Sequence, residues 1–202
     1  MTLIKVELTE QEYRFLTQYR EDEKNKTEFQ QYVDLLKMCY EAAHMTSSDH
    51  SNTNAALIVT AFGKLIPPVA NKLPEKITWT EERTKVRPTK YDFIEHAERG
   101  VIYSAARKGI STEGATMVCP WVACADCSRA IVNAGIVKVV THRQRNDLTS
   151  LGRENVIDTT SDRWVNPISN GAIILQEGGV EVVQLDFVAG LKTLINEKVI
   201  EI

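Results

Sequence analysis

The tripeptide His96-Ala97-Glu98 and the tetrapeptide Cys124-Ala125-Asp126-Cys127 decide the fold of this chain. Together they supply one imidazole, two thiols and a carboxylate. Zinc prefers nitrogen and sulfur ligands, and a catalytic zinc takes three ligands from the protein and leaves a fourth position for water. The pattern therefore predicts that His96, Cys124 and Cys127 bind zinc (Zn2+), and that Glu98 carries protons to and from the water.

The segments around both motifs predict helices that begin near the metal. Asp92 with Glu95 can cap a helix over about residues 93–108, and a strand over residues 116–122 precedes a second helix that opens at Cys124. The N-terminus of a helix carries a partial positive charge, which stabilises carboxylates and thiolates. We therefore expect two helix N-termini to converge on one metal.

Other interpretations of these residues are open. A lone C-x-x-C motif also occurs in redox pairs and in structural zinc sites, and a glutamate is common in a first helical turn. A structural zinc site would need a fourth ligand. The spare candidates for that ligand are Cys39, Cys119, His44, His50 and His142.

The order of the two motifs favours catalysis. H-x-E followed by P-C-x-x-C is typical of zinc nucleobase deaminases, in which the glutamate is the general acid and base. Ala123 replaces the proline, and Pro120 lies four residues before Cys124. A zinc that only stabilised the fold would not need Glu98. Glu95 is the nearest alternative carboxylate for proton transfer.

The rest of the chain alternates between helices and strands. Residues 71–89 and 143–164 are expected to form long polar loops. The alternation predicts an α/β fold of three layers, with a mixed five-stranded sheet and helices on both faces. Residues 1–26 are interpreted as an N-terminal extension and residues 27–202 as a zinc-dependent deaminase domain. The remaining expected elements are a helix at 29–43, strands at 55–62, 65–70, 137–141 and 180–185, and helices at 168–176 and 187–196.

Composition limits the kind of partner. The 202 residues are 43% hydrophobic and 25% charged, with a formal net charge of −3. That balance suits one soluble domain and argues against a binder of duplex nucleic acid or of a membrane surface, which usually carries excess positive charge. No apolar run approaches the roughly 18 residues of a membrane span. Four cysteines, two of them in the expected site, favour a reducing, cytoplasmic location.

The chain also resembles the deoxycytidylate (dCMP) deaminases of the cytidine deaminase-like superfamily over about residues 30–190. Residues 90–109 are similar to the histidine-containing helix of that family, and residues 114–131 match its cysteine region without a gap. Residues 49–59 resemble its entry into the first strand. Residues 70–74 resemble a degraded Gly-Tyr-Asn-Gly-x-Pro motif that keeps only the asparagine, Asn71, and the proline.

This resemblance implies a cytidine deaminase-like fold and zinc-dependent conversion of dCMP to dUMP and ammonia. It also implies a free nucleotide as partner and assembly into dimers or hexamers. Arginine suits a monophosphate because it can bond two oxygens at once, but the sequence does not choose among the basic residues of the two loops. Asp126 could bond the exocyclic amine or cap its helix. The candidate substrate-binding residues are Asn71, Ala97, Trp121, Ala123, Arg143 and Arg145.

Three alternative functions stay open. One is deamination of another free nucleotide, including a purine or a modified base, since the same site attacks adenine. Another is editing of polymeric nucleic acid, although such proteins usually combine a basic groove with stacking aromatics, and only 7% of these residues are aromatic. The last is a non-catalytic binding module stabilised by zinc.

Overall fold

A mixed five-stranded sheet forms the centre of the protein. The computed structural model describes residues 26–149 and 165–202. The strand order is β2-β1-β3-β4-β5, in which β1 is antiparallel to β2 and β3, while β3, β4 and β5 are parallel. The strands are β1 (Ala55–Val59), β2 (Leu65–Ala70), β3 (Thr116–Val118), β4 (Lys138–His142) and β5 (Glu181–Leu185). All five expected strands are confirmed, although β1 and β3 end earlier than their sequences predict.

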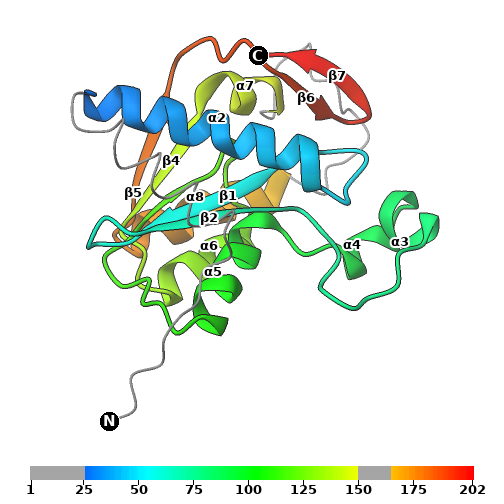
Figure 1. The fold of residues 1–202 in the computed structure, drawn as a ribbon, viewed down its shortest axis with the longest axis horizontal. Helices are drawn as coiled ribbons and strands as arrows, with labels where there is room; N and C mark the ends of the chain where they lie inside the picture. The colour runs from blue at the N-terminus through cyan, green and yellow to red at the C-terminus, as the bar shows by residue number, and fades with distance from the viewer. Residues whose placement is uncertain (1–25, 150–164) are drawn as a thin grey trace.

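Helix α2 (Glu28–Thr46) covers one face of this sheet (Figure 1). Its N-cap, Thr27, forms a reciprocal capping box with Gln30. Successive side chains of a strand point to opposite faces, so Leu57 packs toward α2 while its neighbour Ile58 packs on the other side. The α2 side of the core contains Leu35, Leu36, Cys39, Ala43, Ala55, Leu57, Leu65, Ala70, Val118 and Val140.

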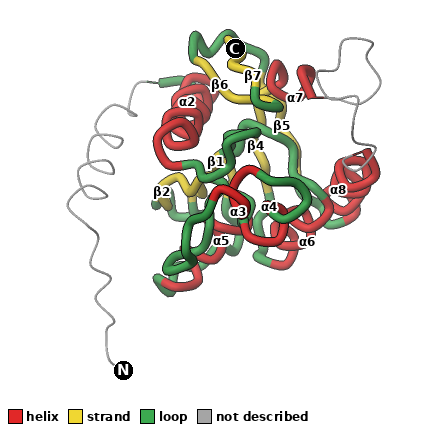
Figure 2. Tube along the Cα trace, turned by 90° about the vertical axis from the view of Figure 1, so that its right-hand side faces the viewer, coloured by secondary structure: helices red, strands yellow, loops and turns green. Residues whose placement is uncertain are grey.

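Helices α5 (Ala97–Arg107), α6 (Ala125–Asn133) and α8 (Val165–Glu177) lie on the opposite side of the sheet from α2, as Figure 2 shows. Their core includes Val101, Met117 and Ile131, which are fully buried. Helices α6 and α8 pack closely against each other. The predicted α/β architecture of three layers is therefore confirmed, and it fixes α5 and α6 beside each other with both N-termini at one edge of the sheet.

The expected helix over residues 93–108 begins later than its sequence predicts. A separate short helix, α4 (Lys90–Phe93), has Ile94 as its C-cap, and α5 begins at Ala97. Between them the backbone is extended, because Glu95 pairs with Lys72 in an isolated antiparallel bridge. The predicted cap by Asp92 and Glu95 is wrong for this reason.

The two long segments expected as loops contain helices. Helix α3 (Glu81–Lys85) lies within 71–89, with Thr80 as its N-cap. Helix α7 (Arg143–Thr149) occupies the start of 143–164. Arg153 and Arg163 lie outside the described residues, as does all but the last residue of the expected N-terminal extension.

The last expected helix, over residues 187–196, is wrong. The chain instead forms a hairpin of β6 (Lys192–Ile195) and β7 (Lys198–Glu201). Asn196 and Glu197 turn between the strands with φ of 49° and 65°, values that a right-handed helix does not allow. The hairpin also bonds to residues that precede β1, including Thr53 with Leu194. Those contacts are tertiary, so local periodicity did not reveal them.

Within residues 26–149 and 165–202, no helix is both long and apolar enough to cross a lipid bilayer.

Candidate metal centre and substrate cavity

The described residues bring one imidazole and two thiols together. The Nδ1 atom of His96 lies 3.7 Å from Sγ of Cys124 and 3.5 Å from Sγ of Cys127. All three ligand atoms lie within 4.8 Å of one another. A tetrahedral zinc with nitrogen at about 2.0–2.1 Å and sulfur at about 2.3 Å holds these two atoms roughly 3.6 Å apart. The predicted triad therefore fits zinc in both donor type and spacing.

The starts of two helices position these ligands. His96 is the N-cap of α5 and Cys124 is the N-cap of α6, and neither side chain bonds the first turn of its own helix. Cys127 then faces the same point from within α6 and is fully buried. The positive ends of both helix dipoles thus lie at the ligands, where they stabilise thiolates. The expectation of two converging helix starts is confirmed.

Glu98 lies in the first turn of α5 and is only 3% exposed. Burial raises the pKa of its carboxyl above the ordinary value, although the nearby His96 opposes this shift. It lines the same cavity as His96 and Cys124. The structure therefore places a buried carboxyl beside the three predicted metal ligands, where a general acid and base for a metal-bound water would have to lie.

The ligands influence one another electrostatically. The hydrogen bond with Cys127 lowers the pKa of the Cys124 thiol to about 4, and the same bond, together with burial, raises the pKa of Cys127. Burial lowers the pKa of His96, but its hydrogen bond to Cys124 and the charge of Glu98 outweigh that effect and raise it overall. The pair thus readily holds one thiolate, the form of cysteine that binds zinc.

Arg99 connects the two motifs on the outside of the centre. Its guanidinium pairs with Glu95 at 2.5 Å and with Asp126 at 3.5 Å, so it ties the start of α5 to the start of α6. Asp126 also pairs with Arg129, and 58% of its side chain is exposed. Neither Glu95 nor Asp126 lines the cavity. Glu98 is therefore better placed than Glu95 for proton transfer. The side chain of Asp126 forms ion pairs with Arg99 and Arg129.

A cavity opens from the triad toward the loop that precedes β1. Its far end is polar and contains one carboxylate and three amides, while its apolar side comes from Trp121, Val122 and Ile168. The residues that line it are Asp49, Asn52, Asn54, Asn71, His96, Glu98, Trp121, Val122, Cys124 and Ile168. Such a cleft, with few polar groups converging beside a metal centre, is typical of a small-molecule site.

Asn71 and Trp121 are the candidate substrate-binding residues that line this cavity. The Oδ1 of Asn71 accepts a hydrogen bond from the backbone N–H of Ala97 at 2.9 Å, and its Nδ2 donates to the carbonyl of Asn52 at 3.3 Å. Asn71 thus supports the first turn of α5 and the loop before β1. Ala97 itself is fully buried and lies outside the cavity lining.

The other three candidates do not line this cavity. Ala123 lines a neighbouring apolar cavity with α8. Arg143, at the start of α7, is 55% exposed and pairs with Asp186 at 3.4 Å. Arg145 is fully buried, and its guanidinium carbon lies 4.8 Å from the centre of the Trp121 ring. Burial lowers the pKa of Arg145 to about 10.

Sequence reasoning missed several residues of the site. Asp49, Asn52, Asn54, Val122 and Ile168 line the cavity but were not among its candidates. The dense run of Asp and Asn before a buried strand was the available signal, because such a run is typical of structured polar loops.

Gly171 was also missed as part of the site's support. A Cβ on this glycine would lie 2.5 Å from the carbonyl oxygen of Ala123 and 3.0 Å from the carbonyl carbon of Cys124. Helix α8 can therefore approach the ligand-bearing turn only because residue 171 has no side chain.

None of the spare histidines and cysteines joins the triad among the residues that the structure describes. His142 bonds the hydroxyl of Tyr40 at 2.7 Å and the carbonyl of Phe187 at 2.9 Å. Cys39 and Cys119 are buried, and His44 and His50 are exposed. A closed four-ligand structural site has no support in this part of the chain.

Comparison with known proteins agrees with this geometry. The family model described as cytidine and deoxycytidylate deaminase zinc-binding region matches residues 29–143. Deoxycytidylate deaminases of Enterobacteria phages T2 and T4 are each 51% identical over 45 residues. That match covers 22% of this chain and 24% and 23%, respectively, of the phage proteins, so it spans only about a quarter of these curated relatives.

Two solved structures have a similar fold. The dCMP deaminase of cyanophage S-TIM5 in apo form has a TM-score of 0.53 at 22% identity, covering 76% of this chain and 96% of that one. A diaminohydroxyphosphoribosylaminopyrimidine deaminase/reductase of Thermotoga maritima has a TM-score of 0.51 at 19% identity, covering 78% and 37%. At these identities the likeness supports the fold, and it confirms the predicted five-stranded architecture.

Proposed function

Because the chain belongs to the cytidine and deoxycytidylate deaminase zinc-binding family, we propose that it hydrolyses dCMP to dUMP and ammonia. The observation that carries this proposal is the cavity in which Glu98 lies beside the ligand set of His96, Cys124 and Cys127. A binding module with a structural zinc would not need a buried carboxyl at that place.

His96, Cys124 and Cys127 would hold the zinc, and the donor set and its spacing fit that metal. Bound zinc would supply a water whose pKa is lowered to about 7 and which is therefore a nucleophile at neutral pH. The rest of the proposed chemistry falls to the protein's own residues, of which Glu98 is the proton carrier.

Glu98 takes one proton from the attacking water and delivers it to N3 of the pyrimidine ring. The water oxygen forms a bond to C4. Glu98 then takes the second proton of that water and gives it to the exocyclic amine, the C4–N bond breaks, and ammonia leaves. The sum is dCMP plus water giving dUMP plus ammonia. Proton transfer of this kind contributes about 10²- to 10⁴-fold to a rate.

The base and phosphate would use different parts of the site. Trp121 lines the cavity and offers a face on which a pyrimidine can stack. Arg143 follows β4, and β3 and β4 are parallel, so Arg143 lies at the same edge of the sheet as the segment that carries Cys124. Its exposure makes Arg143 the better phosphate contact, whereas the enclosed Arg145 would act by holding Trp121.

Support for dCMP itself comes from the relatives. The phage T2 and T4 proteins are deoxycytidylate deaminases, and the cyanophage S-TIM5 dCMP deaminase has been solved in complex with dCMP and dUMP. A homo-oligomer, a dimer or hexamer, and a cytoplasmic location remain part of this proposal.

The proposal is tested with zinc-loaded protein and a panel of dCMP, CMP, deoxycytidine, AMP and a cytosine-containing oligonucleotide. Ammonia release and zinc content are measured on the same samples. Release of ammonia from dCMP in preference to the rest of the panel is the expected result. If ammonia is released only from another free nucleotide, or only from the oligonucleotide, that compound replaces dCMP as the proposed substrate. Stoichiometric zinc with no ammonia from any compound would favour the binding module.

A further inference from the structure

Asp49 brings a second carboxylate to the cavity that contains the metal ligands. It lies in the loop before β1, is 8% exposed, and lines the cavity together with His96 and Glu98. Its Oδ1 accepts three hydrogen bonds, from the backbone N–H of Ser51 at 2.8 Å, the backbone N–H of Asn52 at 3.2 Å and Nζ of Lys90 at 2.8 Å. These bonds fix one oxygen of the carboxylate completely.

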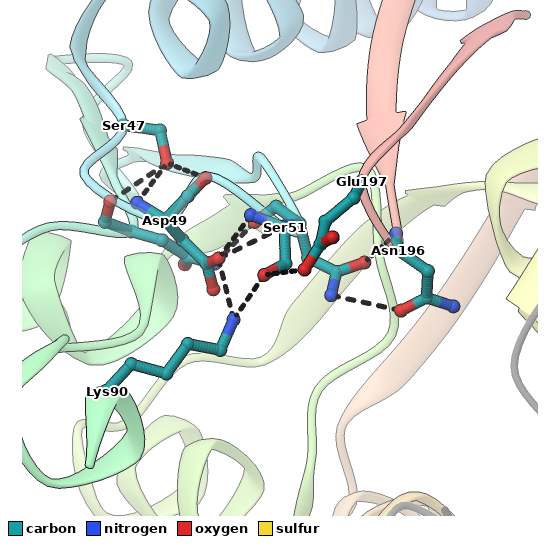
Figure 3. Close-up of polar contacts among 8 residues, drawn as sticks. Ser47, Asp49, Ser51, Lys90, Asn196 and Glu197 are labelled. Atoms are coloured by element: carbon teal, nitrogen blue, oxygen red, sulfur yellow. Dashed lines mark hydrogen bonds and ion pairs between the residues drawn. The ribbon is translucent and has the colours of Figure 1, made fainter. Parts of the chain in front are cut away.

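Lys90 forms a buried ion pair with this carboxylate. The lysine is only 1% exposed, and its ammonium reaches from α4 to Asp49 and to Oγ of Ser51 at 3.0 Å (Figure 3). Burying an ammonium without an opposite charge costs several kcal/mol, so each member of the pair offsets the cost of burying the other. The pair therefore presents a charged acceptor in a fixed position.

The C-terminal hairpin holds the same loop from the other side. The backbone N–H of Glu197 donates to the carbonyl of Ser51 at 2.9 Å, and that of Asn196 donates to Oδ1 of Asn52 at 3.1 Å. Nδ2 of Asn52 also donates to Oδ1 of Asn196 at 3.3 Å. The loop is thus ordered by contacts on two sides before any ligand arrives, which lowers the cost of binding.

The second oxygen of Asp49 differs from the first. Oδ2 accepts no hydrogen bond from any residue within 26–149 and 165–202. The neighbouring amide of Asn52 is engaged with Asn196, and that of Asn71 is engaged with Ala97 and Asn52. A carboxylate only accepts hydrogen bonds. This oxygen therefore selects a donor and repels an anion such as a phosphate.

We propose that Oδ2 of Asp49 accepts a hydrogen bond from the sugar 3′-hydroxyl of the substrate, which makes Asp49 a specificity-determining residue. This inference rests on the proposed function, because a 2′-deoxynucleoside 5′-monophosphate has no other sugar hydroxyl. The same negative charge directs the 5′-phosphate away from the loop end of the cavity. This fixed acceptor thus contributes to substrate orientation, with Lys90 as the positioning residue behind it.

The test compares dCMP with 2′,3′-dideoxycytidine monophosphate, which lacks only the 3′-hydroxyl. A hydrogen bond to a charged group predicts a kcat/KM about 10- to 100-fold higher for dCMP in the zinc-loaded wild-type protein. The double variant Asp49→Asn, Lys90→Met removes both charges together, and it is expected to reduce this ratio to within about 3-fold. The variant Asp34→Asn is the matched control, since Asp34 pairs with Lys26 away from the cavity, and it should keep the wild-type ratio.

The substrate comparison in the wild type decides the question even where the double variant fails to fold. Equal kcat/KM for the two nucleotides overturns the inference while leaving the proposed function intact. Where neither nucleotide is deaminated, the affinity of the zinc-loaded protein for each nucleotide is measured by calorimetry. This measurement tests the role of Asp49 separately from the proposed deamination. Tighter binding of dCMP by a similar factor supports the role of Asp49 without deamination, and equal binding, or none, overturns it.

Discussion

At the metal end of the cavity, the functional groups come from two short motifs at the starts of α5 and α6. At the loop end, Asp49, Asn52 and Asn71 come from segments on either side of the β1–β2 hairpin, and α4 and the C-terminal hairpin hold them. At the first end the residues within each motif are neighbours in sequence, although the two motifs lie 28 positions apart. The second depends on contacts such as that between Ser51 and Glu197, which lie 146 positions apart.

Substitutions at the two ends of the cavity should therefore have different effects. Substitutions at the metal end should remove chemistry with less effect on the fold, because the three candidate ligand atoms lie within 4.8 Å of one another. Substitutions at the loop end should affect stability and substrate discrimination together, since its charges are buried and shared with other elements.

Loss of a metal ligand should have the largest effect. His96→Ala removes the only nitrogen of the triad, so zinc content should fall from about one per chain to a small fraction, and deamination should stop. His44→Ala is the matched control because His44 is exposed on α2. Elemental analysis and ammonia release measure both proteins. Full zinc content in His96→Ala would show that the metal is held elsewhere.

Glu98→Gln should keep zinc and lose turnover. The amide cannot carry a proton, so kcat should fall by about 10²- to 10⁴-fold, with little change in the thermal midpoint. Glu95→Gln is the control, since that neighbouring carboxylate pairs with Arg99 outside the cavity. Near wild-type kcat in the first variant, or an equal loss in both, would refute the assignment of Glu98.

Lys90→Met should destabilise the fold more than it affects the metal. It leaves Asp49 buried and charged without its partner, which costs about 3–5 kcal/mol in the free energy of unfolding. Lys26→Met removes the same group from the more exposed Lys26–Asp34 pair and should cost less than about 1 kcal/mol. Denaturant unfolding of both variants gives the comparison. Equal small losses would mean that the loop end tolerates an unpaired carboxylate.

Gly171→Ala should disturb the metal end through packing. The added methyl meets backbone atoms of residues 123 and 124, so α8 must shift, at about 1–3 kcal/mol. Gly100→Ala places its methyl 3.0 Å from a side-chain atom of Val69, which can move, and should cost less. Thermal unfolding with zinc titration checks both, and an unchanged zinc affinity and midpoint in Gly171→Ala would contradict the close contact.

Glu197→Gly should have the smallest effect. Glycine suits the positive φ of this turn, so the free energy of unfolding should rise by on the order of 0.5–1 kcal/mol. Zinc content should not change, because the turn contacts the loop end. Lys198→Gly, in the adjacent strand, should instead lower stability. A loss of stability in Glu197→Gly would show that the hydrogen bond between the Glu197 side chain and Ser51 stabilises the fold by more than the positive φ of Glu197 destabilises it.

The sequence alone predicted the cluster of His96, Cys124 and Cys127 that the structure brings together, the five strands of the sheet and helices on both its faces. The role of Glu98 as proton carrier stays a prediction. The confirmed features rest on interactions between residues close in sequence: ligand spacing across one helical turn, alternation along a strand, and glycines such as Gly135 after a helix, with φ of 70°. Zinc chemistry restricts the choice of residues so strongly that a short motif identifies it.

Only the tertiary structure decided the loop end of the cavity, the late start of α5 and the C-terminal hairpin. The stretch over residues 187–196 has apolar spacing that suits a helix, yet it became strand and turn because Thr53, Ser51 and Asn52 offered hydrogen-bond partners. Likewise, Asp49 and Lys90 are ordinary surface residues by type, and burial made them a pair. Local sequence sets which conformations are accessible, but the partners that choose among them come from distant segments once the chain has folded.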